Sequence, residues 1–502
     1  MFDNLKKIHL PFFLSFPFLS LFVINSHLIE FDELVWVVLG CGIIGAIITA
    51  FVKSKKAVLL LSISWMLFYI FGHIRLVLLD EPDFWHIADF TAPMFTMTVG
   101  MLAFGFWKRR TDFSRVTHYA NIAGLTLVTL VIIQIGMFAD QQPQFTSNAV
   151  EGYIESDFME SVGPKGAPNI LYIIPDGYGR NDVLLDVYGY DNTPFTNTLE
   201  DMGFKIGHGF SNYVHTHLSM SSTLNMQYLD PTDWNLDYGT ENHQYAKQMI
   251  EDNSVIRTLK ENGYTLVNID SQFEATRSNP LFDYNLCSVS ATDNELLILF
   301  SNTSIMQLIG GGLQGDLHEN RLCAFENVPY SSIDKKLTPL GEATETETIE
   351  PYFVMMHILM PHPPYLFDSE GNHLEVRPFD FGADWDKQQA WDTPEAYIEH
   401  LKFFNSKIID TIIHFDGIVI IQSDHGIAEG VEWSDVKDEQ VYNRLANFTA
   451  VNHPDFDPDR SPVNTWRQIF GLPLIDDKYY FSEYKKSYDF IDYTTVINDI
   501  DR

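Results

Sequence analysis

Long apolar runs fill the first third of the chain, whereas shorter apolar runs alternate with polar segments in the rest. Five of the early runs are long enough to cross a bilayer, which takes about 20 residues of α-helix. These runs lie at 8–25, 34–52, 57–79, 88–107 and 118–138. No small-residue cleavage site follows the first run, so we interpret it as a retained helix rather than a removed signal peptide. The pattern predicts a transmembrane domain of five helices over residues 1–138.

The charges in the short connections between these runs predict the orientation of the domain. Basic connections contain Lys6 and Lys7, then Lys53, Lys55 and Lys56, then Lys108, Arg109, Arg110 and Arg115. The connections between them are acidic and contain Glu30, Asp32 and Glu33, then Asp80, Glu81 and Asp83. Basic segments remain on the cytoplasmic side, which predicts a cytoplasmic N-terminus. Five crossings then place the chain after about residue 140 on the periplasmic or extracellular side of the inner (plasma) membrane.

Beyond the membrane domain, the chain is typical of a linker followed by an α/β domain. Residues 139–168 are polar and show no clear period, which predicts a linker. From residue 169 to 502, short apolar runs alternate with amphipathic stretches, as in a domain with a mostly parallel sheet. The candidate buried strands are 169–176, 264–270, 352–360 and 418–424.

One further apolar stretch, residues 295–313, resembles a sixth span. It contains Ser, Asn, Thr and Gln and is interrupted by three consecutive glycines. A crossing at this point would also place the candidate strands 169–176 and 418–424 on opposite sides of the bilayer. We therefore expect a helix that packs on the domain or lies at the membrane surface.

The net charge limits the possible binding partners, and the cysteines indicate a possible disulfide. The formal net charge is −35, which argues against nucleic acid, since phosphate binding needs a basic surface. Of the three cysteines, Cys41 lies inside the second apolar run. Cys287 and Cys323 belong to the part expected in an oxidising compartment and could form a disulfide.

Acidic and histidine residues recur where three of the candidate strands end. Residues 169–176 end at Asp176, residues 352–360 contain His357 and lead to His362, and residues 418–424 end at Asp424 with His425 next. Ligands of open α/β sheets bind at the carboxyl ends of the strands. Asp and His side chains that converge there can hold a hard or borderline divalent cation. The sequence therefore predicts a metal site at this edge of the sheet.

A nucleophile is expected between the first of these strands and the others. In residues 211–229, an extended segment leads to Thr216, where a helical pattern begins. A hydroxyl at a helix start lies where unpaired N–H groups favour anions, and a metal on its oxygen would lower its pKa. Thr216 could also be a simple helix cap. The spacing leaves Ser219, Ser221 and Ser222 as alternatives.

Several motifs occur in an order that resembles a known superfamily. They are YIIPDGYGR, TPFTNTLEDMGF, SNYVHTHLSMSS, HILMPHPPY and SDHG. Together they resemble the sulfatase/alkaline-phosphatase superfamily and, within it, the membrane-bound branch of phosphoethanolamine transferases and lipoteichoic-acid synthases. That branch also has about five N-terminal spans, a linker and an extracytoplasmic catalytic domain.

The resemblance implies a role for each candidate residue. Asp176 matches the first metal ligand, Asp424 and His425 match the Asp-His ligand pair, and Thr216 matches a metal-bound nucleophile. His362 matches a histidine near the transferred phosphoryl group. His357 lies five residues earlier and is assigned only a possible supporting position behind these groups. The implied cofactor is a divalent ion, Zn²⁺ or Mn²⁺.

The chain also departs from the superfamily pattern. No Cys/Ser-x-Pro-x-Arg motif, which sulfatases mature to formylglycine, follows the first strand. Asp176 replaces the usual Glu of the transferases, and their dense ectodomain disulfides are missing. The histidine that they carry shortly after the Asp-His pair has no clear match here.

The function implied is a metal-dependent phosphotransferase that moves a phospholipid-derived headgroup to an envelope glycan or lipid through a phosphothreonine intermediate. Its expected partners are a phospholipid donor and an envelope acceptor. One alternative keeps the same site but transfers to water, as a phosphodiesterase or sulfuric ester hydrolase. Another alternative is a non-catalytic envelope scaffold, although such a protein has no chemical need for Asp176, Thr216, Asp424 and His425 together.

Overall fold

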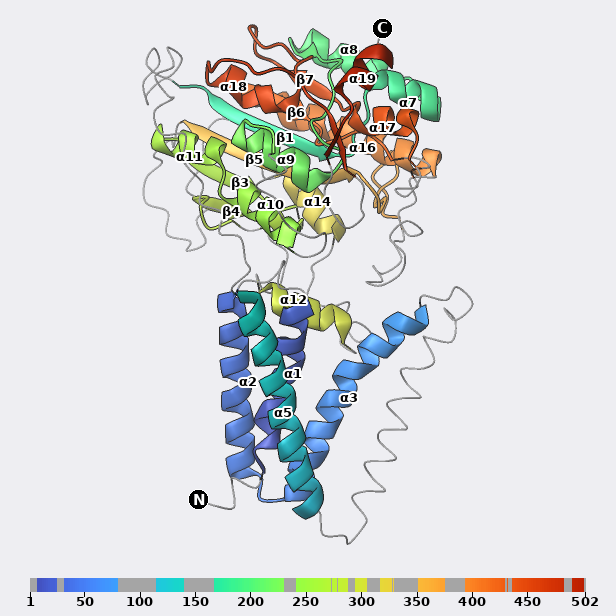
Figure 1. The fold of residues 1–502 in the computed structure, drawn as a ribbon. Helices are drawn as coiled ribbons and strands as arrows, with labels where there is room; N and C mark the ends of the chain where they lie inside the picture. The colour runs from blue at the N-terminus through green and yellow to red at the C-terminus, as the bar shows by residue number, and fades with distance from the viewer. Residues whose placement is uncertain are drawn as a thin grey trace. The chain divides into compact units, whose positions relative to one another are not determined.

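The protein forms two compact units, shown in Figure 1. The first, here called the helical unit, comprises Met1–Pro143, Ser290–Gly315 and Arg377–Gln388. The second, the α/β unit, comprises Gln144–Val289, Asp316–Val376 and Gln389–Arg502. The computed structural model describes residues 7–24, 31–79, 114–139, 167–229, 241–271, 273–277, 279–287, 294–304, 317–326, 328, 351–374, 393–428, 431, 436–482 and 490–500.

Helices of the helical unit coincide with four of the five predicted apolar runs. They are α1 (His9–Ile24), α2 (Phe31–Phe51), α3 (Lys55–Leu79) and α5 (Ser114–Ala139). The predicted run at 88–107 lies outside the described residues. Judged by length and composition, Phe31–Phe51 and Ser114–Gly136 could each cross a membrane, and His9–Val23 is apolar but shorter.

A short helix from the middle of the chain also belongs to the helical unit. This helix, α12 (Glu295–Thr303), begins the apolar stretch for which we expected a surface helix. At about 1.5 Å per residue it is too short to span a bilayer. Its Phe300 ring lies 4.4 Å from that of Phe18 and 5.4 Å from that of Trp65, between centroids. Glu33 Oε2 accepts a hydrogen bond from Leu296 N, at 3.2 Å. The described part of the stretch therefore packs on α1, α2 and α3.

The α/β unit is built on a seven-stranded sheet in the order β2-β7-β6-β1-β5-β3-β4. Parallel pairing joins β6, β1, β5, β3 and β4, while β7 pairs in antiparallel orientation with both β6 and β2. The strands are β1 (Asn169–Asp176), β2 (Lys205–Ile206), β3 (Thr265–Ile269), β4 (Tyr284–Leu286), β5 (Tyr352–Pro361), β6 (Gly417–Gln422) and β7 (Thr449–Val451). A separate antiparallel pair is formed by β8 (Tyr480–Ser482) and β9 (Phe490–Asp492). The four predicted buried strands are confirmed as β1, β3, β5 and β6.

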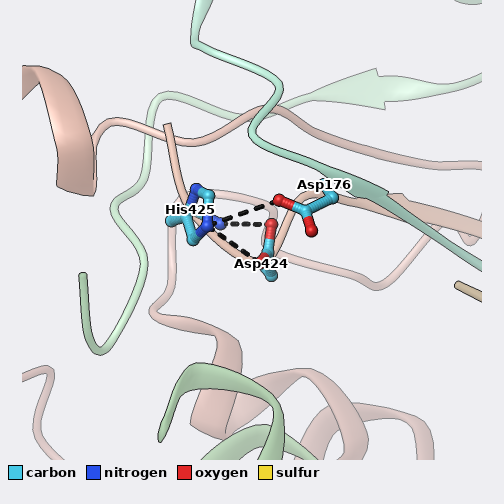
Figure 2. A group of neighbouring side chains, drawn as sticks. All are labelled: Asp176, Asp424 and His425. Atoms are coloured by element: carbon cyan, nitrogen blue, oxygen red, sulfur yellow. Dashed lines mark hydrogen bonds and ion pairs between the residues drawn. The ribbon is translucent and has the colours of Figure 1, made fainter. Parts of the chain in front are cut away.

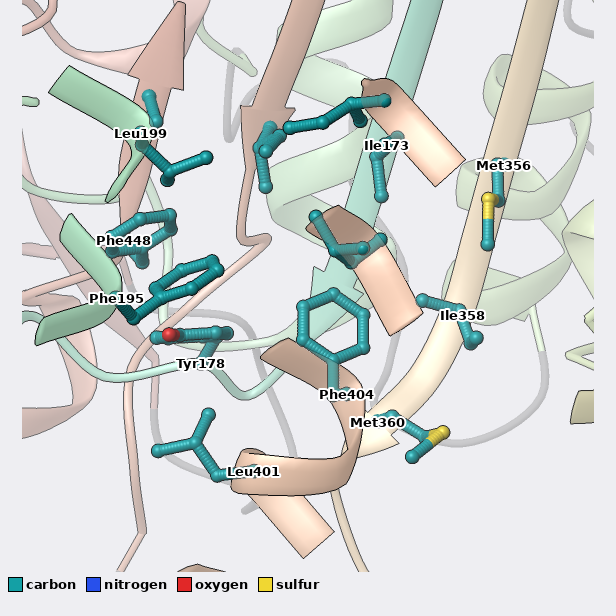
Figure 3. Packing of buried hydrophobic residues seen from close by; sticks show 14 of the residues in the cluster. Ile173, Tyr178, Phe195, Leu199, Met356, Ile358, Met360, Leu401, Phe404 and Phe448 are labelled. Carbon is teal, nitrogen blue, oxygen red and sulfur yellow. The ribbon is translucent and has the colours of Figure 1, made fainter. Parts of the chain in front are cut away.

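Each face of the sheet has its own apolar core because side chains alternate along a strand. On β1, Leu171 and Ile173 enter one core, whereas Ile170, Tyr172 and Ile174 enter the other. Figure 3 shows part of the first core, in which side chains of the strands meet those of the covering helices. Burial on both faces explains why β1 is apolar along almost its whole length.

Helices cover both faces of the sheet. The helices that contribute to the first core are α7 (Asn181–Tyr188), α8 (Thr193–Asp201), α14 (Leu317–Glu326), α16 (Pro394–Ile412), α17 (Asp438–Leu445) and α19 (Thr494–Ile500). Those that contribute to the second are α9 (Thr216–Asn225), α10 (Glu241–Glu251), α11 (Ser254–Glu261) and α18 (Thr465–Ile469). Two short 3₁₀ segments are η3 (Glu274–Thr276) and η5 (Pro462–Asn464).

Cys287 and Cys323 form a disulfide, with 5.6 Å between their Cα atoms. Cys287 directly follows β4 and Cys323 lies on α14, so the bond joins the edge of the sheet to a covering helix. The pairing that the sequence left open is thus present in the structure.

Candidate metal and nucleophile site

Neighbouring strands bring the predicted site residues to one edge of the sheet. β1 ends at Asp176, β6 is followed by Asp424 and His425, and β5 contains His357 and leads to His362. β1 lies between β5 and β6 and is parallel to both. The carboxyl ends of these three strands are therefore adjacent, where ligands of open α/β sheets bind.

Asp176, Asp424 and His425 form a buried group whose ligand atoms all lie within 4.8 Å of one another (Figure 2). His425 Nε2 lies 3.4 Å from Asp176 Oδ1 and 3.1 Å from Asp424 Oδ2. Neither of these two oxygens has a hydrogen-bond partner within the part of the chain that the structure describes. His425 Nδ1 lies 2.9 Å from Gly426 O, to which it donates, so the Nε2 lone pair faces the carboxylates. This donor set fits a divalent cation.

The electrostatics of the group also favour a cation. Burial raises the pKa of Asp176 to about 7, partly offset by the positive charges of Arg444 and Arg321. Burial and the negative charge of the neighbouring Asp176 together raise the pKa of Asp424 to about 7. Burial holds the pKa of His425 well below its usual range, so its ring is neutral. Two carboxyl groups that resist ionisation side by side would be stabilised as anions by a bound metal ion.

Thr216 lies at the start of α9 with its hydroxyl toward this group. Thr216 Oγ1 is 3.1 Å from His425 Nε2. His215 occupies the N-cap position, so Thr216 is the first helical residue and not the cap. Thr216 is also the only residue between 211 and 226 that is not buried. Thr216 therefore lies near the group and is only partly buried.

The three alternative nucleophiles have other partners. Ser219 Oγ lies 3.3 Å from Ser211 Oγ, Ser221 Oγ donates to His217 O at 2.7 Å, and Ser222 Oγ donates to Gln227 O at 2.7 Å. All three serines are buried. The geometry thus favours Thr216 over each of them.

His362 and His357 lie beside the group. His362 N donates to Asp176 O at 3.0 Å, and its ring Nδ1 contacts Pro363 O, so Nδ1 carries the hydrogen in the neutral ring. Burial lowers the pKa of His362 to about 4, so this ring is neutral at pH 7 and its Nε2 is an acceptor. His357 Nε2 lies 3.8 Å from Asp176 Oδ2, and its Nδ1 lies 2.9 Å from Thr276 Oγ1. His357 thus contacts the carboxylate oxygen that does not face His425.

One further residue at the site, Arg444 of α17, could not be predicted from the sequence. Its Nη2 donates to His425 Nε2 at 2.8 Å, its Nε to Val214 O at 2.9 Å and its Nη1 to Gly426 O at 3.2 Å. Arg444 lies 19 residues after His425. The distance from Arg444 to His425 depends on how α17, the helix that follows β6, packs on the sheet. No local pattern in the sequence indicates that packing.

Comparison with known proteins identifies the α/β unit. A family model described as Sulfatase matches residues 168–458, which is more than half of the chain. A search of curated protein sequences found no match to this chain.

The chain is also similar to several solved structures. The C-terminal periplasmic domain of EptC from Escherichia coli is 14% identical, with a TM-score of 0.39 over 66% of this chain and 93% of that one. The integral membrane protein lipooligosaccharide phosphoethanolamine transferase A from Neisseria meningitidis is 11% identical, with a TM-score of 0.31 over 96% of this chain and 93% of that one. Lipoteichoic acid synthase LtaP from Listeria monocytogenes is 12% identical, with a TM-score of 0.34 over 70% of this chain and 81% of that one.

Proposed function

The chain belongs to the sulfatase family, and on this premise we propose that it is a membrane-bound, metal-dependent phosphotransferase. In this proposal it moves a phospholipid-derived phospho-headgroup to an envelope glycan or lipid through a phosphothreonine intermediate. The observation that carries the proposal is the position of Thr216, a partly exposed residue that begins α9 and whose Oγ1 lies 3.1 Å from His425 Nε2.

The choice of a phosphoryl group over a sulfuryl group follows from the nucleophile. A sulfatase uses formylglycine, made from Cys or Ser, and residues 211–226 place Thr216 at the site while their serines hydrogen-bond elsewhere. A threonine hydroxyl can form a stable phosphodiester, and the N-terminus of α9 favours the negative charge of the transferring group.

We assign Asp176, Asp424, His425 and Thr216 as the residues that would hold the cation, Zn²⁺ or Mn²⁺ by the chemistry of the donor set. When bound, it would lower the pKa of the Thr216 hydroxyl and neutralise charge on the transferring group. The chain's own residues orient these donors. Gly177 N and His425 N both donate to Asp424 Oδ1, at 3.1 and 2.9 Å, which leaves Oδ2 directed at the group.

Transfer would then take place in two displacements. Thr216 Oγ forms a bond to phosphorus as the bond from phosphorus to the lipid oxygen breaks, and the lipid alcohol leaves with a proton. An acceptor hydroxyl then attacks the phosphothreonine and releases Thr216. We assign His362 the role of accepting a hydrogen bond or proton through Nε2, since its ring is neutral and its Nδ1 hydrogen is committed to Pro363 O.

The membrane location suits a lipid donor. We propose five spans, a cytoplasmic N-terminus and a periplasmic or extracellular catalytic domain over residues 169–502, joined by a linker at 139–168. The alternating charges of the connections support this orientation. On α2 the side chains of Trp36, Ile43 and Phe51 are exposed, as expected for a surface that faces lipid. Attachment to the bilayer concentrates a lipid donor near the site.

Mass spectrometry of the peptide that contains Thr216 tests the proposal. Protein purified from its own membranes should carry a headgroup-phosphate adduct on Thr216, and the mass of the adduct would name the headgroup. The adduct should be absent from Thr216→Val and present in the control variant Ser222→Ala, because Ser222 Oγ donates to Gln227 O at the other end of α9.

Two further results would change the conclusion. Headgroup release into water at the same rate with and without envelope acceptors would indicate a hydrolase instead of a transferase. Thr216→Val protein that still cleaves phosphodiesters at the wild-type rate would refute the assignment of the nucleophile.

A further inference from the structure

A polar cavity lies in the helical unit between α3 and α5. Its volume is about 240 Å³. The described residues that line it are Lys55, Ser114, Thr117, His118 and Asn121. Lys55 is the first residue of α3, and the other four belong to the first turns of α5. Two helices thus contribute to the cavity, and every described side chain in its lining is polar.

The lining residues of α5 form one stripe along the helix. Positions 114, 117, 118 and 121 follow the spacing i, i+3, i+4 and i+7, which places them on one face. Ser114 and His118 are exposed, Asn121 is partly buried and Thr117 is buried. The cavity therefore extends from the surface into the space between the helices.

The charge of the lining selects an anion. Lys55 is a cation, and no acidic side chain is among the lining residues that the structure describes. Lys7 does not compete for this role, because its Nζ donates to Thr49 O at 2.9 Å and to Val52 O at 2.8 Å, at the end of α2. Lys55 is therefore the lysine that the cavity itself presents to a ligand.

The hydrogen-bonding groups suit the oxygens of a phosphate. The Lys55 ammonium, the hydroxyl groups of Ser114 and Thr117 and the Asn121 amide can all donate. Asn121 Oδ1 accepts from His9 N at 3.0 Å, so the amide nitrogen is the group left for the cavity. Pockets for drug-sized ligands measure about 300–1,000 Å³. The smaller volume here fits a headgroup and not a whole lipid.

We propose that this cavity binds the phosphate-bearing headgroup of an anionic phospholipid, with Lys55 on the phosphate and the polar stripe of α5 donating hydrogen bonds. In the proposed orientation, this end of the helical unit meets the cytoplasmic leaflet, whose anionic lipids bind basic pockets between helices. The inference uses the proposed membrane location but not the proposed transfer chemistry, since the proposed catalytic residues belong to the α/β unit.

Photo-crosslinking of the full-length protein in phosphatidylcholine nanodiscs tests this site. The probe is phosphatidylglycerol with a photoreactive diazirine next to its headgroup, and mass spectrometry maps the adducts. Wild-type protein should give a saturable adduct on the peptides that contain Lys55 or residues 114–121. A phosphatidylcholine probe, which has no net charge, should give no saturable adduct there.

A matched pair of lysine variants makes the test specific. Lys55→Gln should raise the probe concentration for half-maximal labelling about 10-fold, the usual effect of losing a charged hydrogen bond. Lys53→Gln removes the same charge from the same connection, but Lys53 is exposed and is not among the lining residues, so labelling should be unchanged. Equal labelling of the two variants would overturn the inference.

Two further variants guard against a glutamine variant that fails to fold. Lys55→Arg keeps the charge and should keep the labelling. Asn121→Asp keeps an oxygen to accept from His9 N but adds a negative charge to the cavity, so labelling should fall at least about 10-fold. Full labelling of Asn121→Asp would refute the site.

Competition identifies the source of the phosphate. Unlabelled phosphatidylglycerol should displace the probe at far lower concentration than inorganic phosphate does, because the acyl chains hold the headgroup at the bilayer surface. Inorganic phosphate that displaces the probe equally well would overturn the assignment to a lipid.

The inference and the proposed function fail in different ways. Labelling that depends on Lys55, in a protein that forms no Thr216 adduct and transfers no headgroup, would leave the lipid site standing and refute the transferase alone. A Thr216 adduct without labelling that depends on Lys55 would refute only the lipid site.

Discussion

Single atoms decide the chemistry of this site, and His425 Nε2 is the central one. It faces two carboxylate oxygens, accepts from Arg444 and lies next to the Thr216 hydroxyl. Without a metal ion, this arrangement buries two acidic groups whose ionisation is costly, since each has a pKa of about 7. A cation bound as proposed would relieve this cost, so the metal-free protein should be less stable than the metal-loaded one.

The stability of the metal-free protein should consequently depend on pH. The folded-state pKa values of Asp176 and Asp424 are raised above the unfolded value of about 4. Stabilisation by a raised pKa is complete below the unfolded value and is lost as the pH rises through the folded value of about 7. Thermal unfolding in a chelator should therefore occur at a lower temperature at pH 8.5 than at pH 5.5. Zinc should remove this loss at pH 8.5, because it binds the ionised carboxylates.

Asp424→Asn provides the control for this prediction. Asparagine keeps an oxygen to accept from Gly177 N and His425 N but carries no charge. Its metal-free form should unfold at a temperature that depends less on pH than the wild type, while zinc affinity should fall by about 100-fold. A wild-type pH dependence that persists fully in Asp424→Asn would assign it to the large negative surface charge instead.

At the scale of elements, the sequence predicts what depends on local pattern. β1, β3, β5 and β6 were predictable because strands buried on both faces are continuous apolar runs. The strands β2, β4 and β7 have only two or three residues each, too few to show a period. Spacing alone did not separate Thr216 from three nearby serines, whereas the family resemblance and the geometry both favour it. Arg444 is brought to the site only by the packing of α17. The sequence thus predicted the side chains at the ends of the long strands. It did not predict side chains whose positions depend on how the helices pack.

α12 shows the same limit. The sequence shows that this helix is apolar, but it does not show which helices it packs against. Its Phe300 enters an aromatic cluster with Phe18 and Trp65. This packing predicts that Phe18→Cys and Phe300→Cys, combined in a Cys41→Ser background, form a disulfide under mild oxidation. The linked peptides would be identified by mass spectrometry.

A second cysteine pair makes this crosslinking test specific. Ile47 of α2 is exposed, so Ile47→Cys combined with Phe300→Cys should give no crosslink. Equal yields from both pairs, or no yield from Phe18→Cys with Phe300→Cys, would contradict the packing of α12 on α1.

At the scale of the whole molecule, the chain combines an apolar N-terminal third with a region, residues 168–458, that matches the Sulfatase family model. The orientation we propose depends on the lysines and arginines between the apolar runs, which are expected to remain in the cytoplasm. The connection between α2 and α3 is the most compact of these, with Lys53, Lys55 and Lys56 close together. If this connection is cytoplasmic, the proposed catalytic site, which follows after an odd number of proposed crossings, must be on the other side, with the proposed envelope acceptors.

Labelling of single engineered cysteines checks this orientation in intact cells. In a Cys41→Ser background, Ser54→Cys and Asp455→Cys both place a thiol at an exposed position, the first between α2 and α3 and the second in the α/β unit. A membrane-impermeant maleimide should label Asp455→Cys in intact cells, whereas Ser54→Cys should react only after lysis. Because Cys287 and Cys323 are joined in a disulfide, they should not react in either case. The reverse pattern would place the site in the cytoplasm, and labelling of both positions in intact cells would require an even number of crossings between them.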